Sequence, residues 1–197
     1  PQRLAEHLQT LVQELFGLGE KAQAVDIQRA FHAGGVTAAQ QQRRKGAADL
    51  TLLEVAAQAP ADLVINTHVC RGNYHSTFFS SGAYDGVADL LFGEEQVNAY
   101  YLEYDDERSG GFAPLAKVTG DKKVVLGLIT TKRPELEEKE TVIARIHEAA
   151  KYVPLERLYL SPQCGFASCE IGNKLTEEEQ WAKLRLVKEV AEEVWGK

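Results

Sequence analysis

The stretch that decides the fold is KVVLGLITTKRPELEEKETVIARIHEAAKYVPLERLYLSPQC, residues 123–164. It begins with an almost continuous apolar run, 123–130, and a second, shorter run covers 157–161. The segment between them, 134–153, has helical character, and Pro134 suits the first turn of a helix. A strand, a helix and a strand in succession indicate a parallel sheet with covered faces.

Neighbouring segments extend this alternation. Apolar runs at 62–67 and 98–104 predict two further strands, and the segment 84–92 between them has helical character. Residues 176–195 predict a C-terminal helix, because Thr176-Glu-Glu-Glu179 fits a capping box. Its apolar stripe is expected at Trp181, Leu184, Val187, Ala191 and Val194. The expected class is α/β.

The first part of the chain is less regular. Residues 4–16 predict an amphipathic helix, and residues 21–28 predict a short strand from a weak pattern. We divide the expected single domain 1–197 into an N-terminal segment, 1–46, and a region 47–197 that bears the site. The chain starts at Pro1 and contains no Met, so we expect a fragment, an engineered sequence or an incomplete sequence.

Composition excludes several classes of protein. The chain has 197 residues, of which 44% are hydrophobic and 26% charged, and this suits one substantial core. A net charge of −7 argues against a nucleic-acid partner, which requires a clustered positive surface. The apolar runs are too short to span a membrane, which takes about 20 residues. Three cysteines favour a reducing compartment, and we expect the cytoplasm.

Residues able to bind a metal follow the predicted strands. His68 and Cys70 lie two apart in an extended segment, so their side chains point to the same side. Glu103 ends the next strand, and Cys164 follows the last one. Because the carboxyl ends of parallel strands open into the site, these four side chains form a candidate tetrahedral set for Zn²⁺.

Other residues of the same types have simpler interpretations. An isolated Cys in a strand is more often a buried apolar residue than a ligand, and Cys169 is expected to be structural. The remaining histidines are expected on the solvated surface: His7, His32, His75 and His147. No glycine-rich phosphate loop follows any predicted strand, so nothing supports a nucleotide-dependent enzyme.

Four ordered segments carry a resemblance to a known family: INTHVCRGN (65–73), YYLEYDDERSG (100–110), VVLGLITTKRPELEEKETVIARI (124–146) and YVPLERLYLSPQCGFAS (152–168). Together they resemble the C-terminal half of the catalytic barrel of cobalamin-independent methionine synthase. The resemblance covers roughly residues 47–196. It implies a TIM-type (β/α)₈ barrel, of which this chain holds only the C-terminal strands and helices.

The resemblance also implies a reaction. His68, Cys70, Glu103 and Cys164 would bind zinc, which lowers the pKa of the homocysteine thiol so that it attacks the methyl group of a methyltetrahydrofolate. Asp26 would correspond to an Asp that binds the amino group of homocysteine. Where the folate-dependent members place a His after the seventh strand, this chain has Ile129-Thr130-Thr131, and this departure leaves the methyl donor open.

Two alternatives remain open at this point. An epoxyalkane:coenzyme M transferase would bind a sulfonate thiol, for which Arg71 and Arg108 are candidates. A non-catalytic barrel fragment would hold a structural zinc or no metal. Four protein ligands resemble a closed structural site, so in an enzyme the substrate thiol must displace one, and Glu103 is expected to yield as the hardest ligand. An oligomer is left open.

Overall fold

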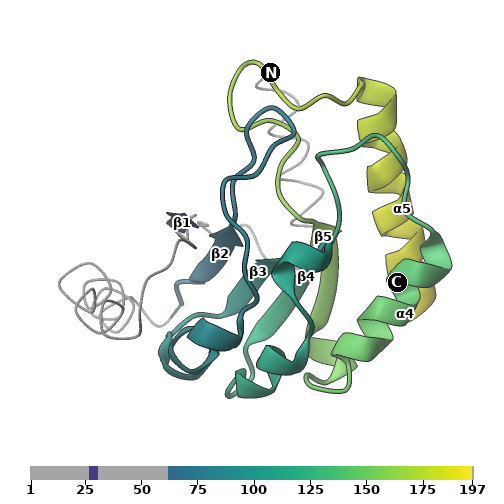
Figure 1. The fold of residues 1–197 in the computed structure, drawn as a ribbon. Helices are drawn as coiled ribbons and strands as arrows, with labels where there is room; N and C mark the ends of the chain where they lie inside the picture. Colours follow the sequence, from purple (N-terminus) through teal and green to yellow (C-terminus); the bar gives the residue numbers. More distant parts are fainter. Residues whose placement is uncertain (1–26, 31–61, 197) are drawn as a thin grey trace.

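The computed structural model describes residues 27–30 and 62–196. In these residues five parallel strands form one sheet in the sequential order β1-β2-β3-β4-β5 (Figure 1). The strands are β1 Ile27–Ala30, β2 Asn66–Cys70, β3 Ala99–Glu103, β4 Lys123–Ile129 and β5 Leu158–Pro162. Parallel strands that follow one another in space as they do in the sequence are the arrangement found in an α/β barrel. The α/β class is confirmed.

Three of the predicted strands agree closely with β3, β4 and β5. The strand predicted at 62–67 is displaced, because β2 runs from Asn66 to Cys70 and so includes the two metal-ligand candidates. Its register explains the displacement: β2 pairs with β3 from Asn66 to Val69. The weak strand prediction at 21–28 shares only its last two residues with β1.

Two α-helices lie together on one side of the sheet, next to β4 and β5 (Figure 1). They are α4 Lys139–Ala149 and α5 Glu177–Trp195. The predicted start of this helix at Pro134 was wrong, because α4 begins at Lys139. Glu137 instead interacts with the end of β4, where its Oε1 accepts from the backbone N–H of Thr130 at 2.8 Å. The preceding segment therefore stays outside the helix.

The segment predicted to be helical at 84–92 is irregular. It forms a 3-10 turn, η1 Asp85–Val87, followed by a π-helical turn, η2 Asp89–Glu94. Three more 3-10 turns occur in the described residues: η3 Glu107–Ser109, η4 Ala113–Lys117 and η5 Leu155–Arg157. The segment packs through its aromatic residues, since Phe92 and Tyr84 are both buried in the core.

The predicted capping box at the start of α5 is confirmed. The Thr176 hydroxyl accepts from the Glu179 N–H at 3.2 Å, and the Glu179 carboxylate accepts from the Thr176 N–H at 2.7 Å. The predicted apolar stripe was partly wrong, because Leu186 and Val190 are buried while Leu184 is only half-buried. The helix is turned so that Lys183 faces inward, where its ammonium pairs with Glu137 at 3.0 Å.

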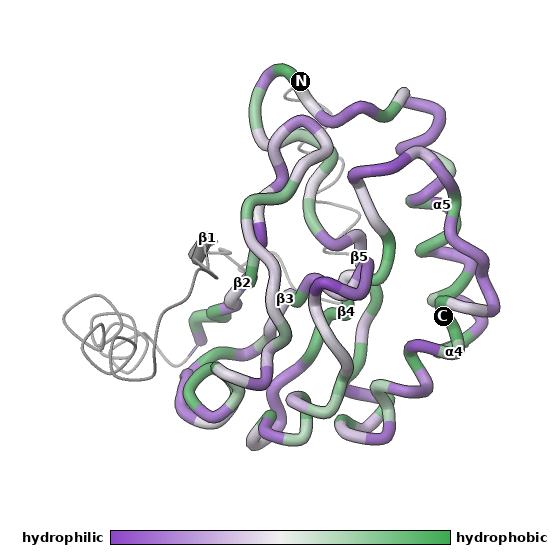
Figure 2. Tube along the Cα trace, in the orientation of Figure 1, coloured by the Kyte–Doolittle hydropathy of each residue, from purple (hydrophilic) through white to green (hydrophobic). Residues whose placement is uncertain are grey.

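The two faces of the sheet differ in character. Alternate residues of the strands form the apolar face, which packs against the helices: Leu102, Val124, Leu126, Leu128, Leu158 and Leu160. Figure 2 shows apolar colouring along β4 and mixed colouring along α4 and α5. The opposite face carries polar side chains, among them His68, Glu103 and Lys123. No helix in the described ranges combines the length and apolarity needed to cross a membrane.

Candidate metal centre

Four potential ligands meet at the carboxyl end of the sheet. One ligand atom from each of His68, Cys70, Glu103 and Cys164 lies within 4.8 Å of the others. Tetrahedral zinc with bonds of about 2.0–2.3 Å requires ligand atoms roughly 3.3–3.8 Å apart, so a small contraction would complete the sphere. The structure thus brings together all four residues that the sequence singled out.

His68 is oriented by a backbone carbonyl. Its Nδ1 lies 3.1 Å from the Tyr101 oxygen, and an Nδ1–H donated to that oxygen leaves the Nε2 lone pair for a metal. Nε2 is buried without a hydrogen-bond partner. Burial lowers the pKa of His68, but the neighbouring Cys70 and Glu103 outweigh it and raise the pKa. This nitrogen is therefore available to bind a metal.

The two thiols behave as a pair. The hydrogen bond from Cys164 lowers the pKa of Cys70, whereas the same bond and burial raise the pKa of Cys164. The Gly72 N–H also donates to Cys70 Sγ at 3.3 Å. Gly72 has a φ of +101°, and a Cβ there would lie 2.7 Å from the Phe79 nitrogen. Only glycine fits this turn, which supplies a thiolate-stabilising donor.

Glu103 is a buried carboxyl group with incomplete hydrogen bonding. Its side chain is 0% exposed, and burial raises its pKa to about 7 although the charges of Lys132 and Arg108 lower it. Its Oε2 lies 3.4 Å from Arg108 Nη2, and its Oε1 has no hydrogen-bond partner. Burial of a carboxylate is costly unless it is paired or bound to a metal. The free oxygen therefore suits a ligand.

The two arginines proposed as substrate contacts are engaged within the protein. Arg71 is buried and donates to the Gly82 oxygen at 2.7 Å and to the Tyr84 hydroxyl at 2.7 Å. Arg108 pairs with Asp105 at 2.8 Å and also with Asp106. Asp26, the third proposed substrate contact, lies outside the described residues.

Three loops around the centre are joined by Asn173, which the sequence analysis missed. Its Nδ2 donates to Asn73 Oδ1 at 2.9 Å and to the Thr131 oxygen at 2.8 Å, while Asn73 donates to the Gly165 oxygen at 2.7 Å. These bonds connect the loops after β2, β4 and β5. Nothing local in the sequence signals them, because Asn73 and Asn173 are 100 residues apart.

Gly127 was also missed, although a glycine inside an apolar strand is a recognisable signal of close backbone approach. It pairs with Glu103 in register, and a Cβ there would lie 2.7 Å from both the Leu102 oxygen and Gln163 Cα. Gln163 precedes Cys164, and its Oε1 accepts from the Thr131 N–H at 2.9 Å. Gly127 thereby allows the segment that bears Cys164 to approach.

The remaining Cys and His predictions had mixed outcomes. His147 is exposed as predicted, whereas His75 is only half-exposed because its Nδ1 lies 3.1 Å from the Gly172 oxygen. Cys169 is exposed rather than packed, and it lies outside the ligand set. His7 and His32 lie outside the described residues.

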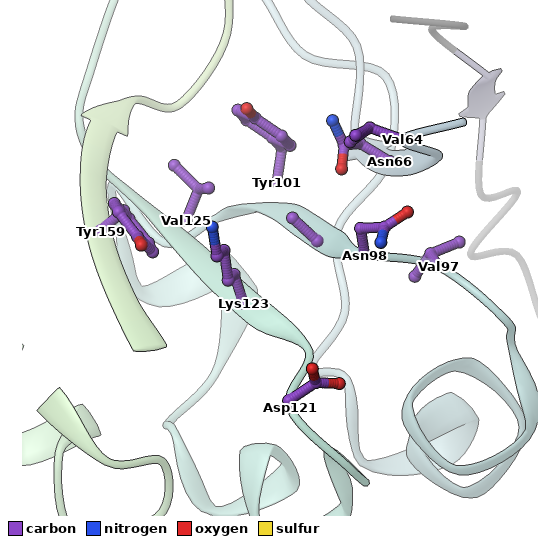
Figure 3. A pocket seen from close by; sticks show the side chains of 10 residues that line it. Val64, Asn66, Val97, Asn98, Tyr101, Asp121, Lys123, Val125 and Tyr159 are labelled. Atoms are coloured by element: carbon purple, nitrogen blue, oxygen red, sulfur yellow. The ribbon is translucent and has the colours of Figure 1, made fainter. Parts of the chain in front are cut away.

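A separate hollow of about 170 Å³ opens at the amino end of the same sheet face (Figure 3). Tyr101, Lys123, Val125 and Tyr159 line it from three adjacent strands. The Lys123 ammonium lies 5.5 Å from the centre of the Tyr159 ring. None of the four metal-ligand candidates lines this hollow.

Comparison with known proteins gives the family to which the chain belongs. Residues 20–193 match the family described as the catalytic domain of cobalamin-independent synthase. The chain is 54% identical to the uncharacterized protein YxjG of Bacillus subtilis (strain 168) over 71% of its length and 37% of that protein. It is 28% identical to a methionine synthase of Pyrococcus horikoshii over 51% of this chain and 26% of the relative.

Solved structures agree in fold. A protein of Listeria monocytogenes, described as a candidate vitamin-B12-independent methionine synthase, is 43% identical with a TM-score of 0.57, over 76% of this chain and 40% of that one. A B12-independent methionine synthase of Shewanella sp. W3-18-1, solved in complex with selenomethionine, has a TM-score of 0.59 at 21% identity. The match covers 74% of this chain and 42% of that one. The chain therefore matches part of their barrels, and it belongs to the cobalamin-independent synthase catalytic-domain family.

Proposed function

We propose that this chain carries the zinc-binding part of an active site that transfers a methyl group to the thiol of homocysteine. The observation that supports it is the convergence of four metal-ligand side chains within 4.8 Å, in a chain of this family. The chain spans 37% of YxjG and 40% of the Listeria protein, so the complete activity is part of the proposal.

The donor set suits zinc more than a harder cation. Two thiols and an imidazole are the ligands that Zn²⁺ prefers, and Mg²⁺ or Ca²⁺ would select oxygen. The orphaned His68 Nε2 and Glu103 Oε1 are the atoms that such an ion would bind. When bound, zinc supplies Lewis acidity that keeps a substrate thiol deprotonated at neutral pH.

The protein's own residues prepare this chemistry. The Tyr101 carbonyl holds the His68 ring in one orientation, and the Gly72 N–H stabilises negative charge on Cys70. Glu103 is the ligand we expect to give its place to the substrate sulfur, since a carboxylate is the hardest donor of the four. This exchange would make the site catalytic rather than structural.

The internal bonds of the arginines favour an amino-acid thiol over a sulfonate thiol. Arg71 and Arg108 each donate to partners inside the protein, which leaves a sulfonate without a free guanidinium among them. Asp26 remains our proposed partner of the substrate amino group. Ile129-Thr130-Thr131 stands where folate-dependent members place a His, and the Thr131 hydroxyl donates to Gln163 Oε1 at 2.9 Å. This departure leaves the methyl donor open, and methyltetrahydrofolate is the candidate that the family suggests. We also propose a cytoplasmic location, where thiols stay reduced.

Zinc analysis with a methylation assay tests the proposal. We expect one zinc per chain and methylation of homocysteine in a screen of several thiols and methyl donors. X-ray absorption at the zinc edge should count two sulfur neighbours, from Cys70 and Cys164, and three with homocysteine. A count that stays at two with every thiol would leave only a structural zinc.

A further inference from the structure

Lys132 is a buried cation that the proposed chemistry does not yet use. It follows β4, the strand between β3 and β5, and so lies between the strand ends that carry Glu103 and Cys164. The residue is 8% exposed, and its Nζ is buried without a hydrogen-bond partner in the described chain. A buried ammonium costs several kcal/mol unless it is compensated.

Two other buried lysines show the usual solution. Lys183 donates to the Glu135 oxygen at 2.7 Å and pairs with Glu137, while Lys122 donates to the Phe92 oxygen at 3.2 Å. Both ammonium groups serve the fold through fixed partners. Lys132 differs because all three of its donors remain available.

The backbone on the N-terminal side of Lys132 is held by hydrogen bonds. Its N–H donates to Thr130 Oγ1 at 3.2 Å, and Thr130 itself is bound by Glu137. The neighbouring Thr131 is fixed to Gln163, the residue before Cys164. The backbone of Lys132 is therefore anchored next to the segment that carries Cys164.

The charge of Lys132 acts on Glu103, whose Oε1 has no hydrogen-bond partner. Lys132 is close enough to lower the pKa of that carboxyl group, yet the two are not among the ion pairs of the described residues within 4.0 Å. Arg108 touches Glu103 only at 3.4 Å and already pairs with Asp105 and Asp106. The positive charge of Arg108 is thus shared among three carboxylates. The ammonium of Lys132 forms no ion pair with any described residue.

We propose that Lys132 is a positioning residue, which receives the Glu103 carboxylate when a substrate thiolate takes its place among the ligands. This inference rests on the proposed function. A displaced Glu103 would be a buried anion that needs a new cationic partner. Among the described residues, Lys132 offers both the charge and the unused donors.

The test uses zinc-loaded protein and counts sulfur neighbours at the zinc edge while homocysteine is added. Lys132→Met removes the charge at similar volume, Lys132→Arg keeps it, and Lys117→Met is a control at an exposed lysine. We expect Lys132→Met to bind zinc but to need about tenfold more thiol, or more, to gain its third sulfur. Lys132→Arg and Lys117→Met should behave like the wild type.

Three results would overturn the inference. Lys132→Met could gain the third sulfur at the wild-type thiol concentration. It could lose affinity for homocysteine but not for 2-mercaptoethanol, which lacks a carboxylate, and Lys132 would then bind the substrate instead. The wild type could itself fail to gain a sulfur, and this distinct result would end the proposed function as well. Circular dichroism and zinc content of each variant establish that it is folded and loaded.

Discussion

The two ends of the polar sheet face are built from the same strands and have opposite properties. At the amino end, Lys123 and Tyr159 line an open hollow, and Lys123 is exposed to solvent (Figure 3). At the carboxyl end, His68 and Glu103 converge with two thiols, and Glu103 is fully buried. The two ends therefore differ in exposure and in the chemistry of their side chains.

Unpaired buried atoms mark the carboxyl end. Among the described residues, six such atoms belong to the ligands or to groups beside them: His68 Nε2, Glu103 Oε1, Asp105 Oδ2, Arg108 Nε, Lys132 Nζ and Gln163 Nε2. The hollow contributes Asn66 Oδ1 to the same set. Because buried polar atoms are normally satisfied, a cluster of unsatisfied ones identifies the end that awaits a ligand.

The largest effect is expected when a thiol is removed from the carboxyl end. Cys164→Ser should weaken zinc binding by more than about 100-fold, beyond the loss of an outer-shell partner, and abolish methylation, because a hydroxyl is a poor ligand at neutral pH. Competition with a zinc chelator measures the affinity. Cys169→Ser is the matched control at an exposed cysteine. Equal losses in both variants would refute the ligand assignment.

In the metal-free protein, the burial of Glu103 should make the free energy of unfolding depend on pH. Its pKa in the folded protein is about 7, raised by burial from 4.5, so between these values the unfolded state ionises first. The free energy of unfolding should then fall as pH rises from about 5 to 7, by up to about 3 kcal/mol. Urea unfolding of the metal-free protein measures this.

The variant Glu103→Gln isolates this contribution, because glutamine has no proton to lose. Its stability should lack the decline between pH 5 and 7 that the wild type shows. If both proteins follow the same curve, the decline comes from other groups.

A smaller effect is expected from crowding the approach of β5 to β4. In Gly127→Ala the new Cβ would meet the Leu102 oxygen and Gln163 Cα at 2.7 Å, so backbone must move. We expect a loss of about 1–3 kcal/mol in unfolding free energy, with weaker zinc binding through Cys164. Gly111→Ala is the control, because a Cβ there meets nothing within 4 Å. Unchanged zinc affinity in Gly127→Ala would separate this glycine from the site.

The smallest effect is expected at the amino end. Lys123→Met removes an exposed ammonium above Tyr159, a contact worth about 0.5–1 kcal/mol. Zinc affinity and thiol affinity should be unchanged, because the substitution lies away from the ligands. A marked loss of either would show that the two ends of this face act together.

Local signals in the sequence were sufficient for β3, β4 and β5, for α5 and for choosing the four candidate ligands. Apolar runs predicted β3, β4 and β5, since a strand buried on one face against helices needs such residues. The capping box predicted the start of α5, because its bonds join residues three apart. The candidates His68, Cys70, Glu103 and Cys164 were predicted from their places at strand ends, where parallel strands gather side chains at one edge.

Tertiary structure decided the properties that depend on distant partners. On the buried face of α5, Lys183 forms an ion pair with Glu137, which lies 46 residues earlier in the chain. The raised pKa of Glu103 and the unpartnered ammonium of Lys132 arise from burial, which no local pattern specifies. Propensity and capping act over a few residues, whereas desolvation and ion pairing depend on what the folded chain places around each group.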